Sequence, residues 1–161
     1  MTTRTTRICI VTPNYISGSP RTVKEADALT QVGYDVRVVF SQGNIEQYRQ
    51  HDTALLSSRK WRHHSFGWSS ARAAERWLFH FSRFRHALAR RLPLPIARLH
   101  PVAEMAQGRV FPELARAAAL ERADLYIGHY PDGLAAAAFA AGCWQTGHAY
   151  DFEDFHVVEG T

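Results

Sequence analysis

The sequence has few cysteines and no long apolar run, and each absence excludes a class of protein. Its two cysteines, Cys9 and Cys143, lie far apart without a CxxC pair or a neighbouring histidine, which excludes a disulfide scaffold and a zinc ribbon. Both thiols are expected to be free and buried. No apolar segment approaches the roughly 20 residues of a membrane span, and the run from Ile8 to Val11 is too short for a signal-peptide core. We therefore expect a cytoplasmic protein.

Acidic residues are nearly absent from the middle of the chain. The segment from Arg59 to Arg98 holds ten Arg and Lys residues and a single acid, Glu75, so it carries +9, although the whole chain carries only +4. The remainder is acidic, most strongly after residue 120. This asymmetry indicates surfaces with different partners. Nucleic acid is not an expected partner, because no recognisable RNA- or DNA-binding motif accompanies the basic charge.

What the sequence does contain is a regular alternation of strand and helix patterns. The length of 161 residues and the 46% hydrophobic content suit one globular domain. Short apolar runs predict strands, and periodic or alanine-rich segments between them predict helices. The strands are expected over 7–13, 34–40, 61–66, 124–129 and 148–152, and the helices over 20–32, 69–92, 102–122 and 132–141. The alternative for 102–122 is a helix interrupted near Gly108 and Pro112. This order predicts an α/β fold, a Rossmann-like doubly wound, mostly parallel sheet with helices on both faces.

The predicted helix over 69–92 is amphipathic and basic. Its apolar stripe, at helical spacing, consists of Ala74, Trp77, Leu78, Phe81, Phe84, Leu88 and Leu92. One interpretation is a surface helix whose apolar stripe packs on the sheet and whose arginines lie in water. The other is a helix that binds an anionic membrane surface. The expected membrane-surface residues are Arg72, Arg76, Trp77, Phe79, Arg83 and Arg90.

Three candidate sites follow from the rule that ligands bind beyond the carboxyl ends of parallel strands. The first is the loop over 12–21, where Gly18 permits close approach and the helix N-terminus favours phosphate. It lacks the later glycines of a dinucleotide fingerprint, and the alternative is an ordinary turn. His129 ends a predicted strand, where it is a candidate base or hydrogen-bonding group, or a structural histidine. The acidic segment 151–156 is a candidate for cation or sugar binding, or a solvated loop.

Taken in order, these segments resemble the N-terminal, acceptor-side domain of the family 4 glycosyltransferases, which have the GT-B fold. The resemblance covers about residues 7–42 and 121–156, whereas the middle matches only in general character. It rests on Arg7-Ile-Cys-Ile-Val-Thr-Pro, on the loop ending Ser19-Pro-Arg, on Glu25-Ala-Asp-Ala-Leu-Thr-Gln-Val-Gly-Tyr-Asp-Val-Arg-Val-Val, on Ala123-Asp-Leu-Tyr-Ile-Gly-His-Tyr and on Tyr150-Asp-Phe-Glu-Asp-Phe.

The resemblance implies a role for each candidate site. Gly18 would face the diphosphate of a nucleotide-diphospho-sugar donor, with Ser19 as a weaker candidate, and His129 would be the catalytic residue near the reacting centre. Asp151 and Glu153 would contact the acceptor, although Phe152 and Glu153 replace the small residue and histidine usual in the family. No metal and no cofactor beyond the donor sugar is implied. The donor-binding C-terminal domain has no counterpart in residues 1–161, so a donor-binding domain or subunit is an expected partner.

The sequence is therefore compatible with three functions. The first is the acceptor-side domain of a retaining glycosyltransferase that acts on a glycan or lipid-linked acceptor and is inactive without its donor-binding half. The second is a non-catalytic membrane-docking or assembly module, located peripherally on the inner face of the membrane through the helix over 69–92. The third, less favoured, treats Asp151 and Glu153 as a manganese-binding pair of a different transferase fold.

Overall fold

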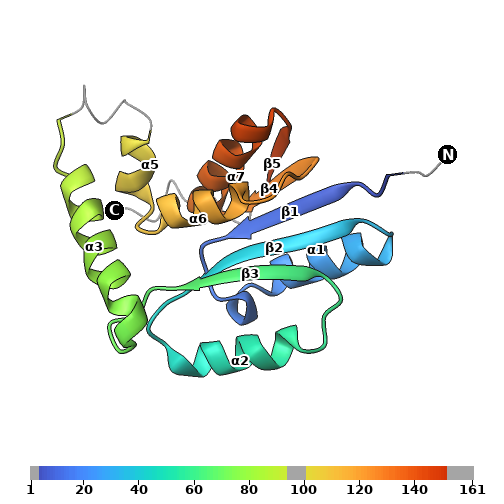
Figure 1. The fold of residues 1–161 in the computed structure, drawn as a ribbon, viewed down its shortest axis with the longest axis horizontal. Helices are drawn as coiled ribbons and strands as arrows, with labels where there is room; N and C mark the ends of the chain where they lie inside the picture. The colour runs from blue at the N-terminus through green and yellow to red at the C-terminus, as the bar shows by residue number, and fades with distance from the viewer. Residues whose placement is uncertain (1–3, 94–100, 152–161) are drawn as a thin grey trace.

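A computed structural model describes residues 4–93 and 101–151 and places them around a five-stranded parallel sheet (Figure 1). The sheet order is β3-β2-β1-β4-β5, so the first strand lies at the centre and the direction of winding reverses beside it. The strands are β1 (Arg7–Thr12), β2 (Asp35–Gln42), β3 (Arg62–Gly67), β4 (Leu125–His129) and β5 (Gly147–Asp151). The predicted α/β class and parallel sheet are confirmed, and the topology is Rossmann-like.

Helices cover both faces of this sheet. One face carries α1 (Pro20–Gln31), which follows the short 3-10 helix η1 (Ile16–Gly18), and α2 (Glu46–Leu56). The opposite face carries α6 (Phe111–Ala119) and α7 (Tyr130–Trp144). Beyond the carboxyl ends of the strands, α3 (Ala73–Ala89) packs against α5 (Val102–Gln107).

The central strands divide the core into two clusters because successive side chains point to opposite faces. Ile8 and Ile10 of β1 join the cluster under α1, whereas Cys9 and Val11 join the cluster under α6 and α7. A strand that is buried on both faces needs apolar residues at every position. This requirement explains why β1 was recognisable as an unbroken apolar run.

Helix α1 ends where the sequence predicted. Gly33 has a φ of 96°, a left-handed conformation that glycine adopts without steric cost. Its N–H donates to the carbonyl of Thr30, and the N–H of Tyr34 donates to the carbonyl of Leu29, both at 3.1 Å. These two bonds form a Schellman motif, which turns the chain directly into β2.

Arg37 is the exception to the apolar centre of β2. Its side chain is buried, and its guanidinium donates to the backbone carbonyls of Ala117, Ala118 and Glu121 at 3.2, 2.7 and 3.3 Å. The last carbonyls of a helix have no partner within it. Arg37 therefore satisfies the C-terminal end of α6 from the neighbouring strand.

The sequence missed α2 because its inner face is polar. The buried residues of this helix are Arg49 and Asp52. Arg49 pairs with Glu75 at 2.5 Å, and Asp52 accepts from the Ser17 N–H and from Gln42 Nε2, each at 2.8 Å. Ion pairs and hydrogen bonds leave no apolar periodicity in the sequence.

The two cysteines differ in burial. Cys143 is exposed rather than buried, whereas Cys9 is buried as expected.

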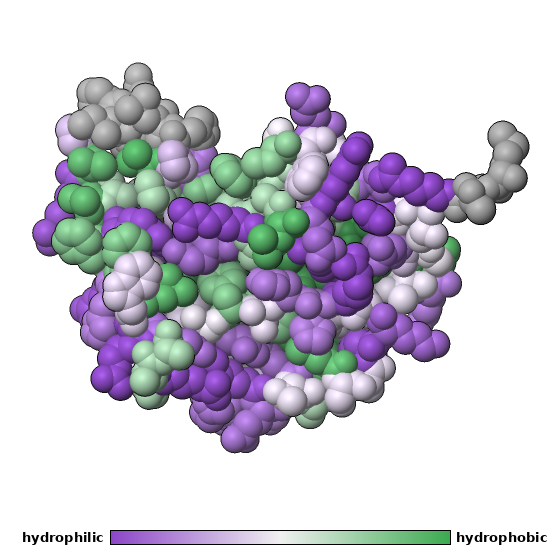
Figure 2. Space-filling model, viewed as in Figure 1, coloured by the Kyte–Doolittle hydropathy of each residue, from purple (hydrophilic) through white to green (hydrophobic). Residues whose placement is uncertain are grey.

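The apolar stripe predicted for α3 does not pack on the sheet. Trp77 is 70% exposed and Phe84 66% exposed, and Phe81 and Leu88 are also exposed. Hydrophobic residues accordingly gather over this end of the molecule (Figure 2). The buried positions of α3 are instead Ser82 and Ala89. The interpretation in which this stripe packs on the sheet is therefore wrong.

No helix within residues 4–93 and 101–151 has both the length and the hydropathy that crossing a bilayer requires.

Helix α7 approaches the sheet closely at two glycines. A Cβ added to Gly128 would lie 2.5 Å from the backbone of Leu134, and one added to Gly133 would lie 2.5 Å from the carbonyl oxygen of Val11. Both neighbours are backbone atoms, which cannot rotate away as a side chain can. The start of α7 can therefore lie against β1 and β4 only because both residues lack a side chain.

We expect Gly133→Ala to lower the free energy of unfolding by about 1–3 kcal/mol, because the added methyl group overpacks the contact with Val11. Gly142→Ala in the same helix is the matched control, since its Cβ would meet nothing within 4 Å, and it should gain about 0.5–1 kcal/mol. Urea denaturation measures both. Equal stability of the two variants would contradict the close contact.

Candidate functional site

The carboxyl ends of the strands bring together four polar side chains from three elements. Arg21 and Glu25 come from the first two turns of α1, His129 ends β4, and Asp151 ends β5. Strands β4 and β5 pair with His129 opposite Asp151. The parallel register therefore places the two sequence-predicted residues side by side, as the rule for open α/β sheets requires.

His129 is the centre of this cluster, and its side chain is fully buried. Its Nε2 lies 2.7 Å from Oε2 of Glu25, and its Nδ1 lies 3.5 Å from Oδ2 of Asp151. Arg21 Nε lies 2.7 Å from the same Asp151 oxygen. The cluster is therefore a chain of polar contacts, Glu25–His129–Asp151–Arg21, in which a carboxylate lies on each side of the imidazole.

This geometry restricts what His129 can do chemically. Nε2, which donates to the Glu25 carboxylate, is not free to accept a proton, so a role as general base would fall to Nδ1, which lies 3.5 Å from Asp151 Oδ2. Held at a strand end, the imidazole can orient a hydroxyl group or hydrogen-bond to a developing negative charge. Arg21 ends the predicted loop site over 12–21, whereas Glu25 was not singled out from the sequence, because only the fold brings Glu25 and His129, 104 positions apart, into contact.

The backbone immediately after His129 is strained. Tyr130 has a φ of 60°, a left-handed conformation that a bulky side chain rarely adopts. Such a residue costs about 1–3 kcal/mol and persists where the surroundings determine it, often at functional sites. Here the surroundings are the close packing of Gly128 and Gly133, which fixes the turn from β4 into α7.

The loop before α1 has open space for a ligand at one residue and an internal hydrogen bond at the next. Gly18 is exposed, and a Cβ there would meet nothing within 4 Å. Ser19 is buried, and its hydroxyl donates to the carbonyl of Tyr15 at 3.1 Å. Its side chain therefore serves the loop itself.

Two buried hydroxyls near this loop have no hydrogen-bond partner. Thr12 ends β1 and Thr22 lies in the first turn of α1, and the Oγ1 atoms of both are buried without a partner. Buried polar atoms in proteins are nearly always satisfied, by protein or by ordered water. These two atoms lie in the two elements that join at the Gly18 loop.

The remaining predicted residues lie apart from this cluster. Glu153 falls outside the described residues. Arg76, Arg83 and Arg90 are exposed on α3, whereas Arg72 donates to Glu46 at 2.7 and 2.9 Å. Phe79 faces inward, with its ring 6.3 Å from that of Trp68. Phe79 is half-buried there, so less of its ring reaches the surface than of the 70% exposed Trp77.

The arrangement offers little to a metal ion. Within the described part of the chain, no group of three His, Cys, Asp or Glu side chains is placed to hold one. Asp151 is already engaged by Arg21 and faces His129.

Comparisons with protein-family models, with curated proteins and with solved structures found no match.

Two aspartates near the ends of β4 have opposite environments. Asp132, in the first turn of α7, packs directly against the backbone of Gly108, and burial raises the pKa of its carboxyl group. Asp124, just before β4, accepts from the Arg7 N–H at 2.9 Å, and this hydrogen bond lowers the pKa of its carboxyl group. The charged form of Asp132 is thus unfavourable in the folded state, and that of Asp124 is favourable.

These shifts predict opposite effects of two equivalent substitutions. At pH 7, Asp132→Asn should raise the free energy of unfolding and Asp124→Asn should lower it. The gain from Asp132→Asn should disappear as the pH falls below the ordinary aspartate pKa of about 3.9. The loss from Asp124→Asn should disappear as the pH falls through its lowered folded pKa. Thermal unfolding at pH 3–8 measures both effects. Equal changes in melting temperature at pH 7 would contradict the opposite environments of the two carboxyl groups.

Proposed function

We propose that this chain is the acceptor-side domain of a glycosyltransferase that uses a nucleotide-diphospho-sugar. The observation that supports it best is the buried His129 at the end of β4, held between Glu25 and Asp151 next to the N-terminus of α1. A helix N-terminus favours an anion. In such a reaction this site would stabilise charge on the departing diphosphate and orient the acceptor hydroxyl group.

The roles of the residues follow from their positions. The exposed Gly18 leaves the approach to the helix N-terminus open, so a diphosphate oxygen can reach backbone N–H groups there. Thr12 and Thr22 offer hydroxyl groups that lack a protein partner. Asp151, between Arg21 and His129, fixes the imidazole rather than binding a metal. The donor base and sugar would require a second domain or subunit, so the chain alone would not be active.

We expect uridine diphosphate to bind weakly to the isolated chain, without a metal, at the Gly18 loop. Amide chemical shifts in a ¹⁵N-labelled sample should change at Gly18, Arg21 and Thr22, equally with EDTA present. Gly18→Leu should abolish these changes without lowering the melting temperature, because its side chain enters open space. Gly142→Ala is the control that leaves them unchanged.

Two results would contradict this proposal. One is the absence of any change at the loop at millimolar nucleotide, tested with guanosine diphosphate as well. The other is binding that requires Mn²⁺, which would instead favour the transferase with a carboxylate-bound manganese.

A second function, docking on an anionic membrane, is favoured by the exposed face of α3. Trp77, Phe81, Phe84 and Leu88 form an apolar ridge that the rest of the described chain leaves exposed. Arg76, Arg83 and Arg90 flank it and take part in none of the ion pairs among the described residues. Aromatic side chains beside unpaired arginines are typical of helices that lie in a membrane interface.

We expect the chain to sediment with vesicles that contain phosphatidylglycerol and not with pure phosphatidylcholine vesicles, in a salt-sensitive manner. Arg76→Glu combined with Arg83→Glu should weaken this binding at least tenfold, since each arginine contributes about 1 kcal/mol. Arg122→Glu, on the exposed surface after α6, is the matched charge reversal. If Arg122→Glu weakens binding as much as the double variant, α3 is not the docking surface.

A further inference from the structure

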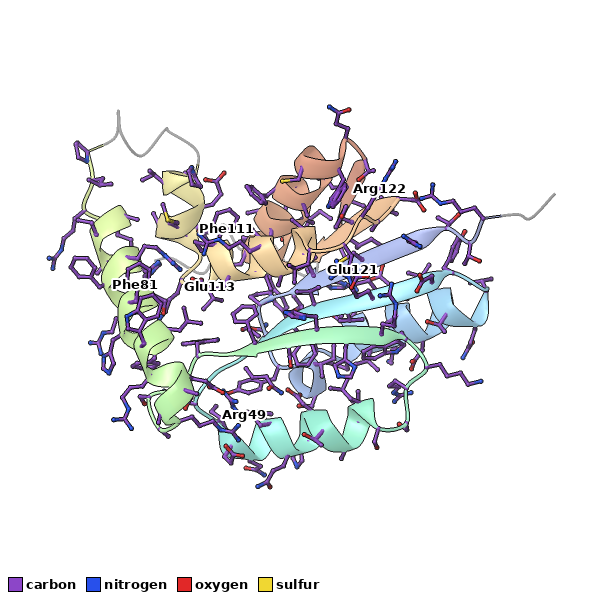
Figure 3. All side chains as sticks on the ribbon, in the orientation of Figure 1. Arg49, Phe81, Phe111, Glu113, Glu121 and Arg122 are labelled. Carbon is purple, nitrogen blue, oxygen red and sulfur yellow. The ribbon has the colours of Figure 1, made fainter. Side chains whose placement is uncertain are left out.

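The outer face of α6 separates two hollows with mostly apolar walls. The first, about 290 Å³, lies toward α5 and α7 and is lined by Phe81, Met105, Phe111, Ala115 and Phe139 among others. The second, about 270 Å³, lies toward β3 and is lined by Phe66, Leu78, Ala117 and Leu120 among others. Figure 3 places Phe111 and Glu113 at the end of α6 that faces α3, with Phe81 on that neighbouring helix. We call these the α5 hollow and the β3 hollow.

Arg116 is the charged residue that both hollows share. It lines each of them, is exposed, and takes part in none of the ion pairs among the described residues. The nearby Glu113 does not neutralise it, because Glu113 accepts from the two terminal nitrogens of Arg85 at 2.8 and 2.7 Å. Arg85 and Glu113 thus offset each other, and Arg116 supplies the net positive charge between the two hollows.

The rims of both hollows expose large apolar side chains. Leu120, at the β3 hollow, is 64% exposed, and Phe139, at the α5 hollow, is 46% exposed. Phe81 lines the α5 hollow and also belongs to the exposed apolar ridge of α3. The α5 hollow therefore continues, through Phe81, the surface that would face a bilayer. Contiguous exposed apolar surface of this kind marks a binding site more often than it marks free protein surface.

We propose that this face of α6 binds a single anionic phospholipid, with one acyl chain in each hollow and the phosphate on Arg116. Two separate apolar hollows with one cation between them match a molecule that has two apolar chains joined at one anion. A single guanidinium group can donate two parallel hydrogen bonds to two oxygens of one phosphate, and this geometry would fix the headgroup. The site lies on the opposite face of the sheet from α1, so it does not depend on the proposed transferase activity.

The test is titration of the full chain with dihexanoyl phosphatidylglycerol below its critical micelle concentration. We expect saturable 1:1 binding by calorimetry. Arg116→Gln, Leu120→Glu and Phe139→Glu should each weaken it at least tenfold. Val32→Glu is the matched control, because Val32 is 74% exposed at the end of α1, and it should leave the affinity unchanged. The single-chain hexanoyl lysolipid and the zwitterionic dihexanoyl phosphatidylcholine should each bind at least tenfold more weakly.

Three results would overturn the proposal: no saturable binding, equal affinity of Arg116→Gln, or equal affinity of the lysolipid. Concentration-dependent self-association that Leu120→Glu removes would also overturn it, because the face would then be an interface between copies of the chain. The Arg76→Glu and Arg83→Glu variant separates this site from docking by α3. It should lose vesicle binding and keep the affinity for the monomeric lipid, whereas loss of both would show that the hollows are not an independent site.

Discussion

The close approach of α7 to the sheet is the contact on which the candidate site depends. Gly128 and Gly133 let the backbone of α7 touch β1 and β4, and no residue with a side chain could replace them without moving the helix. This approach forces the turn at Tyr130 into its strained conformation. It also buries His129 at the strand end, within reach of Glu25 and Asp151. The strained backbone of Tyr130 costs stability, and the packing that causes it also holds His129 in a single orientation.

The arginines that give the middle of the chain its positive charge serve two different purposes. Arg85 forms a partly buried pair with Glu113, and Arg62 joins Asp35 and Glu121 at the amino-terminal edge of the sheet. These ion pairs neutralise the charges of Arg85 and Arg62 within the fold. Arg76, Arg83 and Arg90 on α3, with Arg116 on α6, remain outside the ion pairs of the described chain. The charge available to an anionic partner is therefore smaller and more localised than the +9 of residues 59–98 indicates.

Sequence patterns predicted the elements whose buried faces are apolar. Strands β1, β2 and β4 were found because both faces are buried, and the end of α1 was found because only glycine suits the φ of residue 33. Helix α2 was missed because Arg49 and Asp52 occupy its inner face. The apolar period of α3 identified a real stripe, but periodicity does not say whether another element covers it. His129 was predicted from its place at a strand end, whereas its partner Glu25 required the fold itself.

The buried guanidinium of Arg37 has a consequence for the order in which the chain folds. The unit of β1, α1 and β2 is local in sequence, yet Arg37 finds its acceptors 80 or more residues later, at the end of α6. Without α6, the guanidinium of Arg37 would have none of these acceptors. It would then either be buried unsatisfied, at a cost of several kcal/mol, or keep one face of β2 in contact with water. The amino-terminal half therefore cannot complete the core on this face of the sheet until α6 packs against it. Until then, an apolar sheet face stays open to aggregation.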